Sequence, residues 1–210
     1  MDEYSNKLDT FLLPIISKIN EPVILELGVQ KGVSTNKFLK LCKTNNGKLY
    51  SVDIDDCSKV ADDKNWKFFQ TRDDNFDYIK SNLDKQIDIL YIDSLHEANH
   101  VKKLIYGYYS IIKENGFIFI DDISHLPYLK TEIRNNFYCE INNKETFKCL
   151  LEIYSANKNN FDISFSFYSS GIAIIKKKSK ENINNHKDLK TREATFKNFF
   201  RKLLRKIKKN

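Results

Sequence analysis

The sequence lacks the cysteine pattern of a disulfide-linked or zinc-binding protein. Its four cysteines, Cys42, Cys57, Cys139 and Cys149, are widely spaced and include no Cys-x-x-Cys pair. No secretory signal precedes them, and no apolar run approaches the roughly 20 residues that span a bilayer. We therefore expect a protein of the reducing cytosol that is soluble or peripheral, with the inner face of a membrane as the peripheral location.

The body of the chain also has no net basic charge, although the whole chain carries +7. Residues 176–210 contain 14 Lys and Arg against 3 Asp and Glu, a net +11, which leaves −4 for residues 1–175. Nucleic-acid binding would therefore concern the tail alone. A chain of 210 residues with an apolar fraction of 41% can bury a core, and it predicts one compact domain with appendages.

The first glycine-containing turn lacks the middle glycine of a dinucleotide-binding motif. The apolar run Val23–Leu27 is followed by Gly28 and Gly32. A helical segment comes next, and Ser34 or Thr35 is expected to cap it. Gln30 stands where Gly-x-Gly-x-x-Gly has its second glycine, so a pyrophosphate ligand is disfavoured. A nucleoside that carries an amino acid instead of phosphates fits this turn better.

Apolar runs alternate with helical patterns through residue 177. An amphipathic helix is expected over Leu8–Ile19, and another from Val101 through Ile112 until Asn115-Gly116 ends it. Alternating strands and helices predict a parallel sheet with right-handed crossovers. The expected strands are Val23–Leu27, Leu49–Ile54, Lys67–Gln70, Ile87–Ile92, Phe117–Ile120, Phe161–Tyr168 and Gly171–Lys177, the last two forming a hairpin.

These patterns predict an α/β fold with a Rossmann-like, doubly wound sheet of seven strands, the last strand antiparallel, with helices on both faces. We expect this domain over residues 1–177, a polar linker over 178–190 and a basic amphipathic helix over 191–210. The region Pro127–Asn160, with one helix near Glu145–Ala156, is expected to be a substrate-covering insertion.

Acidic residues follow the second and third expected strands. Asp53 lies about 20 residues past the glycines, where a carboxylate can accept the ribose hydroxyls of a nucleoside. Asp55 and Asp56 are alternative acceptors of these hydroxyls. The other interpretation is that all three aspartates only form a solvated turn. Asp73 is the candidate partner of an adenine amino group, while Asp74 is either its alternative or a helix N-cap.

A second acidic group follows the fourth and fifth expected strands. Neighbouring parallel strands lie about 4.8 Å apart, so Asp93 is expected to meet Asp121 and Asp122 at the carboxyl edge of the sheet. Oxygen ligands alone favour a hard cation such as Mg²⁺, with His96 and His125 as nearby proton acceptors. The alternative is that the aspartates only end a loop and that His96 caps or packs on the next helix.

Four segments together resemble class I S-adenosylmethionine-dependent methyltransferases, and are most similar to the small metal-dependent O-methyltransferases related to the macrolide-sugar (macrocin) and catechol enzymes. The resemblance covers about residues 20–177. The segments are ELGVQKGVST at 26–35, YSVD at 50–53, ILYIDSLH at 89–96 and IKENGFIFIDD at 112–122.

The resemblance implies that Glu26, Gly28 and Asp53 hold the cofactor S-adenosyl-L-methionine, and that Asp93, Asp121 and Asp122 hold Mg²⁺. Together with the turn and the third strand, the expected cofactor-binding set is Glu26, Gly28, Gly32, Ser34, Asp53 and Asp73.

The predicted activity is O-methylation of a small-molecule or sugar hydroxyl, with Mg²⁺ assistance as an open alternative. The cofactor's sulfonium makes its methyl group electrophilic, so the protein must align an acceptor and remove its proton. Asp93 is the candidate base as well as metal ligand, and His96 is the alternative base. Two other functions stay open: a nicotinamide-dependent oxidoreductase, and a non-catalytic nucleoside-binding protein that works through its basic tail.

The tail has the pattern of a basic amphipathic helix. Such a helix can lie on an anionic membrane, where each basic residue contributes about 1 kcal/mol. It can also dock on the body or on a partner protein, while nucleic acid is the less favoured ligand. The apolar positions are Phe196, Phe199, Phe200, Leu203, Leu204 and Ile207, and the basic ones are Lys197, Arg201, Lys202, Arg205, Lys206, Lys208 and Lys209.

Overall fold

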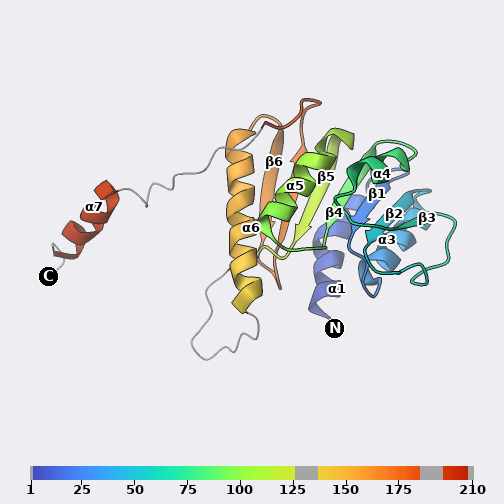
Figure 1. Ribbon diagram of the computed structural model, residues 1–210, viewed down its shortest axis with the longest axis horizontal. Helices are drawn as coiled ribbons and strands as arrows, with labels where there is room; N and C mark the ends of the chain where they lie inside the picture. The colour runs from blue at the N-terminus through green and yellow to red at the C-terminus, as the bar shows by residue number, and fades with distance from the viewer. Residues whose placement is uncertain (1, 126–136, 185–195, 208–210) are drawn as a thin grey trace.

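Seven strands form one sheet with helices on both sides (Figure 1). The computed structural model describes residues 2–125, 137–184 and 196–207. The strands are β1 (Val23–Leu27), β2 (Lys48–Asp53), β3 (Trp66–Gln70), β4 (Ile87–Ile92), β5 (Ile112–Asp121), β6 (Phe161–Ser166) and β7 (Ile172–Lys177). The helices are α1 (Glu3–Lys7), a π-helical turn (Leu8–Leu12), α2 (Leu13–Ile16), α3 (Val33–Thr44), α4 (Phe76–Ser81), α5 (Ala98–Tyr108), a 3₁₀ turn (Tyr109–Ile111), α6 (Phe137–Ala156) and α7 (Phe196–Ile207).

The strand order is β3-β2-β1-β4-β5-β7-β6, and β7 runs antiparallel to both of its neighbours. The other strand pairs are parallel, so the chain reverses its direction of winding between β1 and β4. The predicted Rossmann-like mixed sheet with an antiparallel last strand is therefore confirmed. Ligands of such sheets bind at the carboxyl edge, beside the point where the winding reverses.

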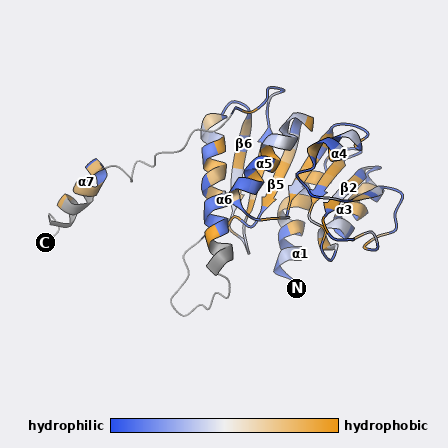
Figure 2. Cartoon of the chain, viewed as in Figure 1, coloured by the Kyte–Doolittle hydropathy of each residue, from blue (hydrophilic) through white to orange (hydrophobic). Residues whose placement is uncertain are grey.

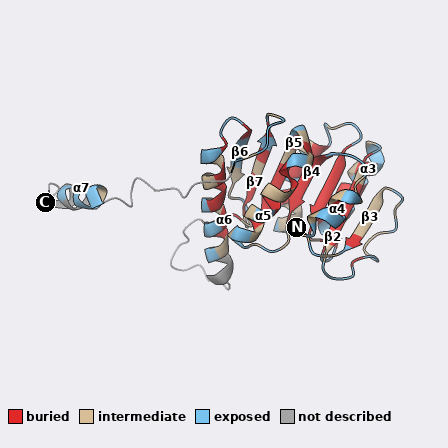
Figure 3. Ribbon diagram, turned by 45° about the horizontal axis from the view of Figure 1, so that its top comes forward, coloured by how far each residue is buried: buried red, intermediate tan, exposed pale blue. Residues whose placement is uncertain are grey.

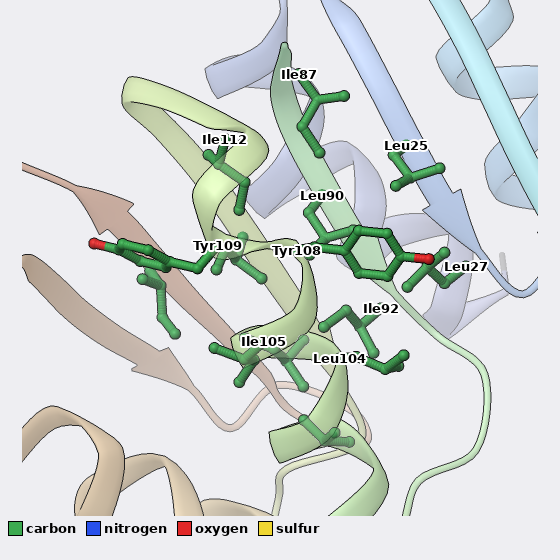
Figure 4. Close-up of a cluster of buried hydrophobic side chains, with 14 of the residues drawn as sticks. Leu25, Leu27, Ile87, Leu90, Ile92, Leu104, Ile105, Tyr108, Tyr109 and Ile112 are labelled. Carbon is green, nitrogen blue, oxygen red and sulfur yellow. The ribbon is translucent and has the colours of Figure 1, made fainter. Parts of the chain in front are cut away.

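Alternating residues of the central strands build two separate cores. Leu25 and Leu90 belong to the core under α4, α5 and α6, whereas Ile24 and Ile89 belong to the core under α3 and the N-terminal helix. Successive side chains of a strand point to opposite faces, so a central strand covered on both faces is buried along its whole length. Every residue of β1 and β4 is buried, as the burial colouring shows for β4 (Figure 3), and Figure 4 shows the first core around Tyr108.

The helix after β4 is shorter than expected. It ends at Tyr108, and after the 3₁₀ turn the chain enters β5 at Ile112 rather than continuing to Asn115. Ile112 pairs with Ile87, after which the register shifts to Ile89 and Phe117. The apolar residues up to Ile112 therefore match a helix and the start of a buried strand equally well, and strand pairing decides between them.

The N-terminal helix begins five residues earlier than the expected Leu8 and includes a π-helical turn from Leu8 to Leu12 before it ends at Ile16. Its inner residues Leu8, Leu12 and Ile16 are fully buried against the sheet. A π-helical turn rotates the residues on either side of it relative to each other and is frequent at functional sites. Here the π-helical turn follows Lys7 directly, so it affects the direction in which the Lys7 side chain points.

The expected covering insertion, Pro127–Asn160, lies partly outside the described residues, which omit 126–136. Its described part is mainly α6, a helix that ends at Ala156 as expected. No helix among the described residues is long and apolar enough to cross a membrane.

Candidate active site

A cavity of about 800 Å³ opens at the carboxyl edge of the sheet. The loops that follow β1, β2, β3, β4 and β5 all contribute to its wall, and so does the start of α1. Of the predicted site residues, the cavity is lined by Gly28, Ser34, Asp53, Asp73, Asp93, His96, Asp121 and Asp122. The structure therefore brings four of the six expected cofactor residues and both expected catalytic residues to one cavity.

The glycine turn is pressed against the end of β4. Gly28 has φ +98°, and a Cβ there would lie 2.1 Å from the Asp93 carbonyl oxygen. Its backbone N–H donates to the Val52 carbonyl at 2.9 Å. Only glycine fits this close approach of two backbones, so this residue sets the floor of the cavity.

The start of α3 differs from the expectation. Gly32 (φ +74°) is the N-cap residue, and it does not line the cavity. The hydroxyls of Ser34 and Thr35, expected to cap the helix, instead donate to Glu26 at 2.5 and 2.8 Å. The predicted side-chain cap is therefore wrong, because the N-cap position is a glycine and both hydroxyl residues lie inside the first turn of the helix.

Glu26 is fully buried and is not part of the cavity wall. Its carboxylate accepts hydrogen bonds from Ser34, Thr35 and Ser51, the last at 2.6 Å. Burial raises the pKa of Glu26 to about 7, although the three hydroxyls act to lower it. In this geometry Glu26 ties β1, β2 and α3 together behind the turn, and direct contact with a cofactor stays a prediction of the sequence.

The raised pKa of Glu26 predicts a stability that depends on pH. The folded protein holds this proton more tightly than the unfolded chain, so stability is highest below the ordinary pKa of 4.5 and falls as the pH rises to about 7. The full loss is on the order of 3 kcal/mol. Urea unfolding of wild type and Glu26→Gln at about pH 5 and about pH 8 should show this loss in the wild type only. Glu3→Gln, at the exposed start of α1, controls for the change of charge. Equal pH dependence of stability in wild type and Glu26→Gln would refute the raised pKa of Glu26.

Asp53 lies at the end of β2 and faces the turn. Its Oδ2 accepts the backbone N–H groups of Val29 at 2.8 Å and Gln30 at 3.1 Å, while Oδ1 accepts that of Asp55. Burial acts to raise the pKa of Asp53, but these backbone donors outweigh it and hold the pKa below its usual value. The carboxylate is thus ionised at neutral pH and partly open to the cavity, as an acceptor of ribose hydroxyls must be.

Asp73 belongs to a small polar cluster that the sequence did not reveal. Its Oδ2 accepts from Ser94 Oγ at 2.5 Å and lies 2.9 Å from His100 Nε2. Burial raises the pKa of Asp73, but His100 and Ser94 outweigh it and the net shift is downward. The alternative, Asp74, instead pairs with Arg72 and Lys103 and is not in the cavity wall. No periodicity or motif pointed to His100, because it comes close to Asp73 only when α5 packs against the loop that follows β3.

The acidic residues after β4 and β5 converge as expected. His96 Nε2 lies 3.7 Å from Asp93 Oδ1 and 3.4 Å from Asp122 Oδ2. Asp121 is almost fully buried behind them. His125 lies apart from this group, with its ring 4.5 Å from that of Phe147.

Three residues that the sequence analysis did not select complete this part of the site. Tyr4 donates to Asp93 Oδ2 at 2.6 Å, and the Tyr91 hydroxyl lies 3.0 Å from the same oxygen. Lys7, fully buried, donates to Asp121 Oδ1. Burial raises the pKa of Asp93 well above its usual range, and the neighbouring Asp121 carboxylate raises it further. Both Tyr4 and Lys7 come from α1, about 90 residues or more away in sequence, so spacing gave no signal.

The predicted magnesium ligands are Asp93, Asp121 and Asp122. Among the residues that the structure describes, no group of three or more His, Cys, Asp or Glu side chains is arranged to hold a metal ion. Asp121 is engaged by Lys7 and by the Asp122 backbone N–H, and Asp93 by the hydroxyls of Tyr4 and Tyr91. The described arrangement does not fit a metal, and metal dependence stays a prediction of the sequence.

Comparison with protein families agrees with this reading of the cavity. Residues 25–123, which include the glycine turn and Asp53, Asp73, Asp93, Asp121 and Asp122, match the family model described as a methyltransferase domain. This segment resembles a methyltransferase domain. Comparison with curated proteins gives no match.

Solved structures with the same fold include several methyltransferases. A candidate caffeoyl-CoA O-methyltransferase from Staphylococcus aureus superposes with a TM-score of 0.62 at 16% identity, over 84% of each chain. PaMTH1 of Podospora anserina, bound to S-adenosylhomocysteine, gives 0.58 at 17% identity over 75% of this chain and 72% of its own. The resemblance of this chain to the class I methyltransferases is confirmed at the level of fold.

A third similar structure is the MycE methyltransferase of mycinamycin biosynthesis, in complex with Mg, S-adenosylhomocysteine and mycinamycin VI. It gives a TM-score of 0.55 at 18% identity over 77% of this chain. The chain spans 46% of the length of MycE.

Proposed function

We propose that this protein transfers a methyl group from S-adenosylmethionine to a hydroxyl oxygen of a small molecule or a sugar. The observation that carries the proposal is the single cavity that joins the Gly28 turn and Asp53 to Asp93 and His96. One end offers a floor for a nucleoside and an ionised carboxylate for its ribose. The other end offers a carboxylate and an imidazole for an acceptor proton.

The cofactor end suits a ligand without phosphates. The turn carries Gln30, itself in a left-handed conformation (φ +49°), in place of the glycine that lets a pyrophosphate approach the helix. The missing glycine argues for S-adenosylmethionine over a nicotinamide dinucleotide, and the S-adenosylhomocysteine bound in PaMTH1 and MycE supports this choice.

The acceptor end has groups that can take a proton. When bound, the cofactor supplies an electrophilic methyl on a positively charged sulfur. Asp93, whose pKa is raised by burial, accepts the proton of the acceptor hydroxyl, with His96 as the alternative base. As the O–H bond gives its electrons to the new O–CH₃ bond, the C–S bond breaks, and S-adenosylhomocysteine and the methyl ether leave.

Calorimetry with S-adenosylmethionine, S-adenosylhomocysteine and NAD tests this proposal directly. The expected result is binding of the first two and none of NAD. A screen of methyl transfer to sugars, nucleotide sugars and catechol-like compounds then finds the acceptor class. No binding of either S-adenosyl compound would refute the proposal, and binding of NAD alone would favour an oxidoreductase.

The α7 helix extends the proposal to location. Its described apolar side chains, Phe196, Phe199, Phe200 and Leu204, are 57–84% exposed. The hydropathy colouring shows hydrophobic and hydrophilic residues along the same helix (Figure 2). In a segment whose net charge is +11, this face fits the surface of an anionic membrane. The membrane-bound protein would meet its acceptor at that surface.

Co-sedimentation with vesicles tests the membrane contact. The full chain is expected to bind phosphatidylserine vesicles in a salt-dependent way and to ignore phosphatidylcholine vesicles. Phe199→Ala combined with Phe200→Ala should weaken partitioning roughly 100-fold, because two half-buried phenylalanines contribute about 3 kcal/mol. Tyr78→Ala, an exposed aromatic residue on α4, is the matched control and should bind like the wild type. No binding by the wild type would point to a partner protein or to nucleic acid instead. Equal binding by the double variant would show that the phenylalanines do not insert into the membrane.

A further inference from the structure

Lys7 places a positive charge beneath the acceptor end of the cavity. The side chain lies at the end of α1 and is fully buried. Its ammonium donates to Asp121 Oδ1 and, at 2.6 Å, to Ser170 Oγ, and it lies 5.3 Å from the centre of the Tyr4 ring. Because a buried charge persists only when it is paired, Lys7 and Asp121 neutralise one another within the chain.

Hydrogen bonds extend from this pair to Asp93. The Tyr91 hydroxyl lies 3.2 Å from Asp121 Oδ2 and 3.0 Å from Asp93 Oδ2. The Tyr4 hydroxyl donates to the same Asp93 oxygen at 2.6 Å. The inward oxygens of both carboxylates are thus held by protein donors, and Asp93 Oδ1 remains on the side of His96.

We propose that Lys7 is a positioning residue that supplies the cation of this site from within the chain, so that methyl transfer needs no divalent metal. The inference rests on the proposed methyl transfer and narrows it. Lys7 compensates the charge of Asp121 and thereby fixes the position of the Tyr91 hydroxyl between Asp121 and Asp93. Asp93 is then the carboxylate that faces the acceptor. A divalent cation beside Asp121 would be repelled by the ammonium, which also engages the Asp121 oxygen that such a cation would need.

Binding of Mn²⁺, followed by its electron paramagnetic resonance signal, tests this inference without an activity assay. The wild-type protein is expected to bind no stoichiometric Mn²⁺. In Lys7→Met the ammonium is removed at similar length, Asp93, Asp121 and Asp122 regain uncompensated charge, and binding of about one Mn²⁺ should appear. Lys37→Met is the matched control: it breaks a more exposed ion pair, with Asp9 beside α1, and should bind none.

Methyl transfer supplies the second readout. A strong chelator should leave the wild-type rate unchanged, while Lys7→Met should transfer at least roughly tenfold more slowly and keep its affinity for S-adenosylhomocysteine. One equivalent of Mn²⁺ bound by the wild type and lost in Asp122→Asn would overturn the inference, whether or not Lys7→Met folds. Unchanged transfer by Lys7→Met in chelator would overturn it as well. Failure of the proposed function is distinct, because it appears as lack of S-adenosylhomocysteine binding in the wild type.

Discussion

Gly28→Ala is expected to weaken binding of S-adenosylmethionine on the order of 100-fold. The added Cβ would lie 2.1 Å from the Asp93 carbonyl oxygen, a contact between two backbones that no side-chain rotation can relieve. The left-handed conformation at φ +98° adds its own cost for alanine. The turn must therefore move away from β4, and a displacement near 1 Å in a binding site can cost about 100-fold. Calorimetry with S-adenosylhomocysteine measures the effect.

The loss of cofactor affinity in Gly28→Ala has to be distinguished from a general loss of folding stability. Gly28→Ala should also lower the free energy of unfolding by about 3 kcal/mol. Gly116→Ala is the matched control, because its Cβ would lie 2.8 Å from the Asp88 carbonyl oxygen, at the opposite end of β4. That variant should lose stability and keep cofactor affinity. If Gly28→Ala binds the cofactor as the wild type does, the turn is not the floor of the cofactor site.

Asp93→Asn is expected to lower the rate of methyl transfer by about 10² to 10⁴, the usual contribution of a general base. Binding of S-adenosylhomocysteine should stay close to the wild-type value, because Asp93 lies at the acceptor end. In the wild type the rate should rise with pH through the raised pKa of Asp93, since only the ionised carboxylate accepts a proton. Single-turnover rates across pH measure both effects.

His96→Asn decides between the two candidate bases. If His96 takes the proton, this variant shows the larger loss and Asp93→Asn keeps most of the rate, which would contradict the assignment to Asp93. Asp162→Asn removes an exposed carboxylate that pairs only with Lys178 among the ion pairs described here, and it controls for loss of charge.

The strand-end carboxylates show how much of the site could be predicted. Asp53, Asp93 and Asp121 follow apolar runs in the sequence, and parallel strands bring such residues to one edge whatever the details of packing. Their convergence therefore depends on local pattern and on a general rule of topology. The same holds for Gly28, whose type alone shows that a close backbone approach is needed.

The partners of these carboxylates could not be predicted. Lys7 and Tyr4 reach Asp121 and Asp93 from the N-terminal helix, and His100 reaches Asp73 from α5. Each contact depends on how a helix packs on the sheet and rotates about its own axis, which the π-helical turn after Lys7 alters. The spacing of apolar residues predicts which face of a helix is buried. It does not predict which polar side chain of that helix contacts a carboxylate at the edge of the sheet.

By itself, the sequence determined the sheet, its winding and the edge at which ligands bind, because alternating buried strands and helices allow few topologies. Only the tertiary structure decided the electrostatics of the site. It turned Glu26 inward onto three hydroxyls and set the ammonium of Lys7 against Asp121. The physical reason is that burial multiplies the energy of each charge interaction, and burial is a property of packed elements that no single segment contains.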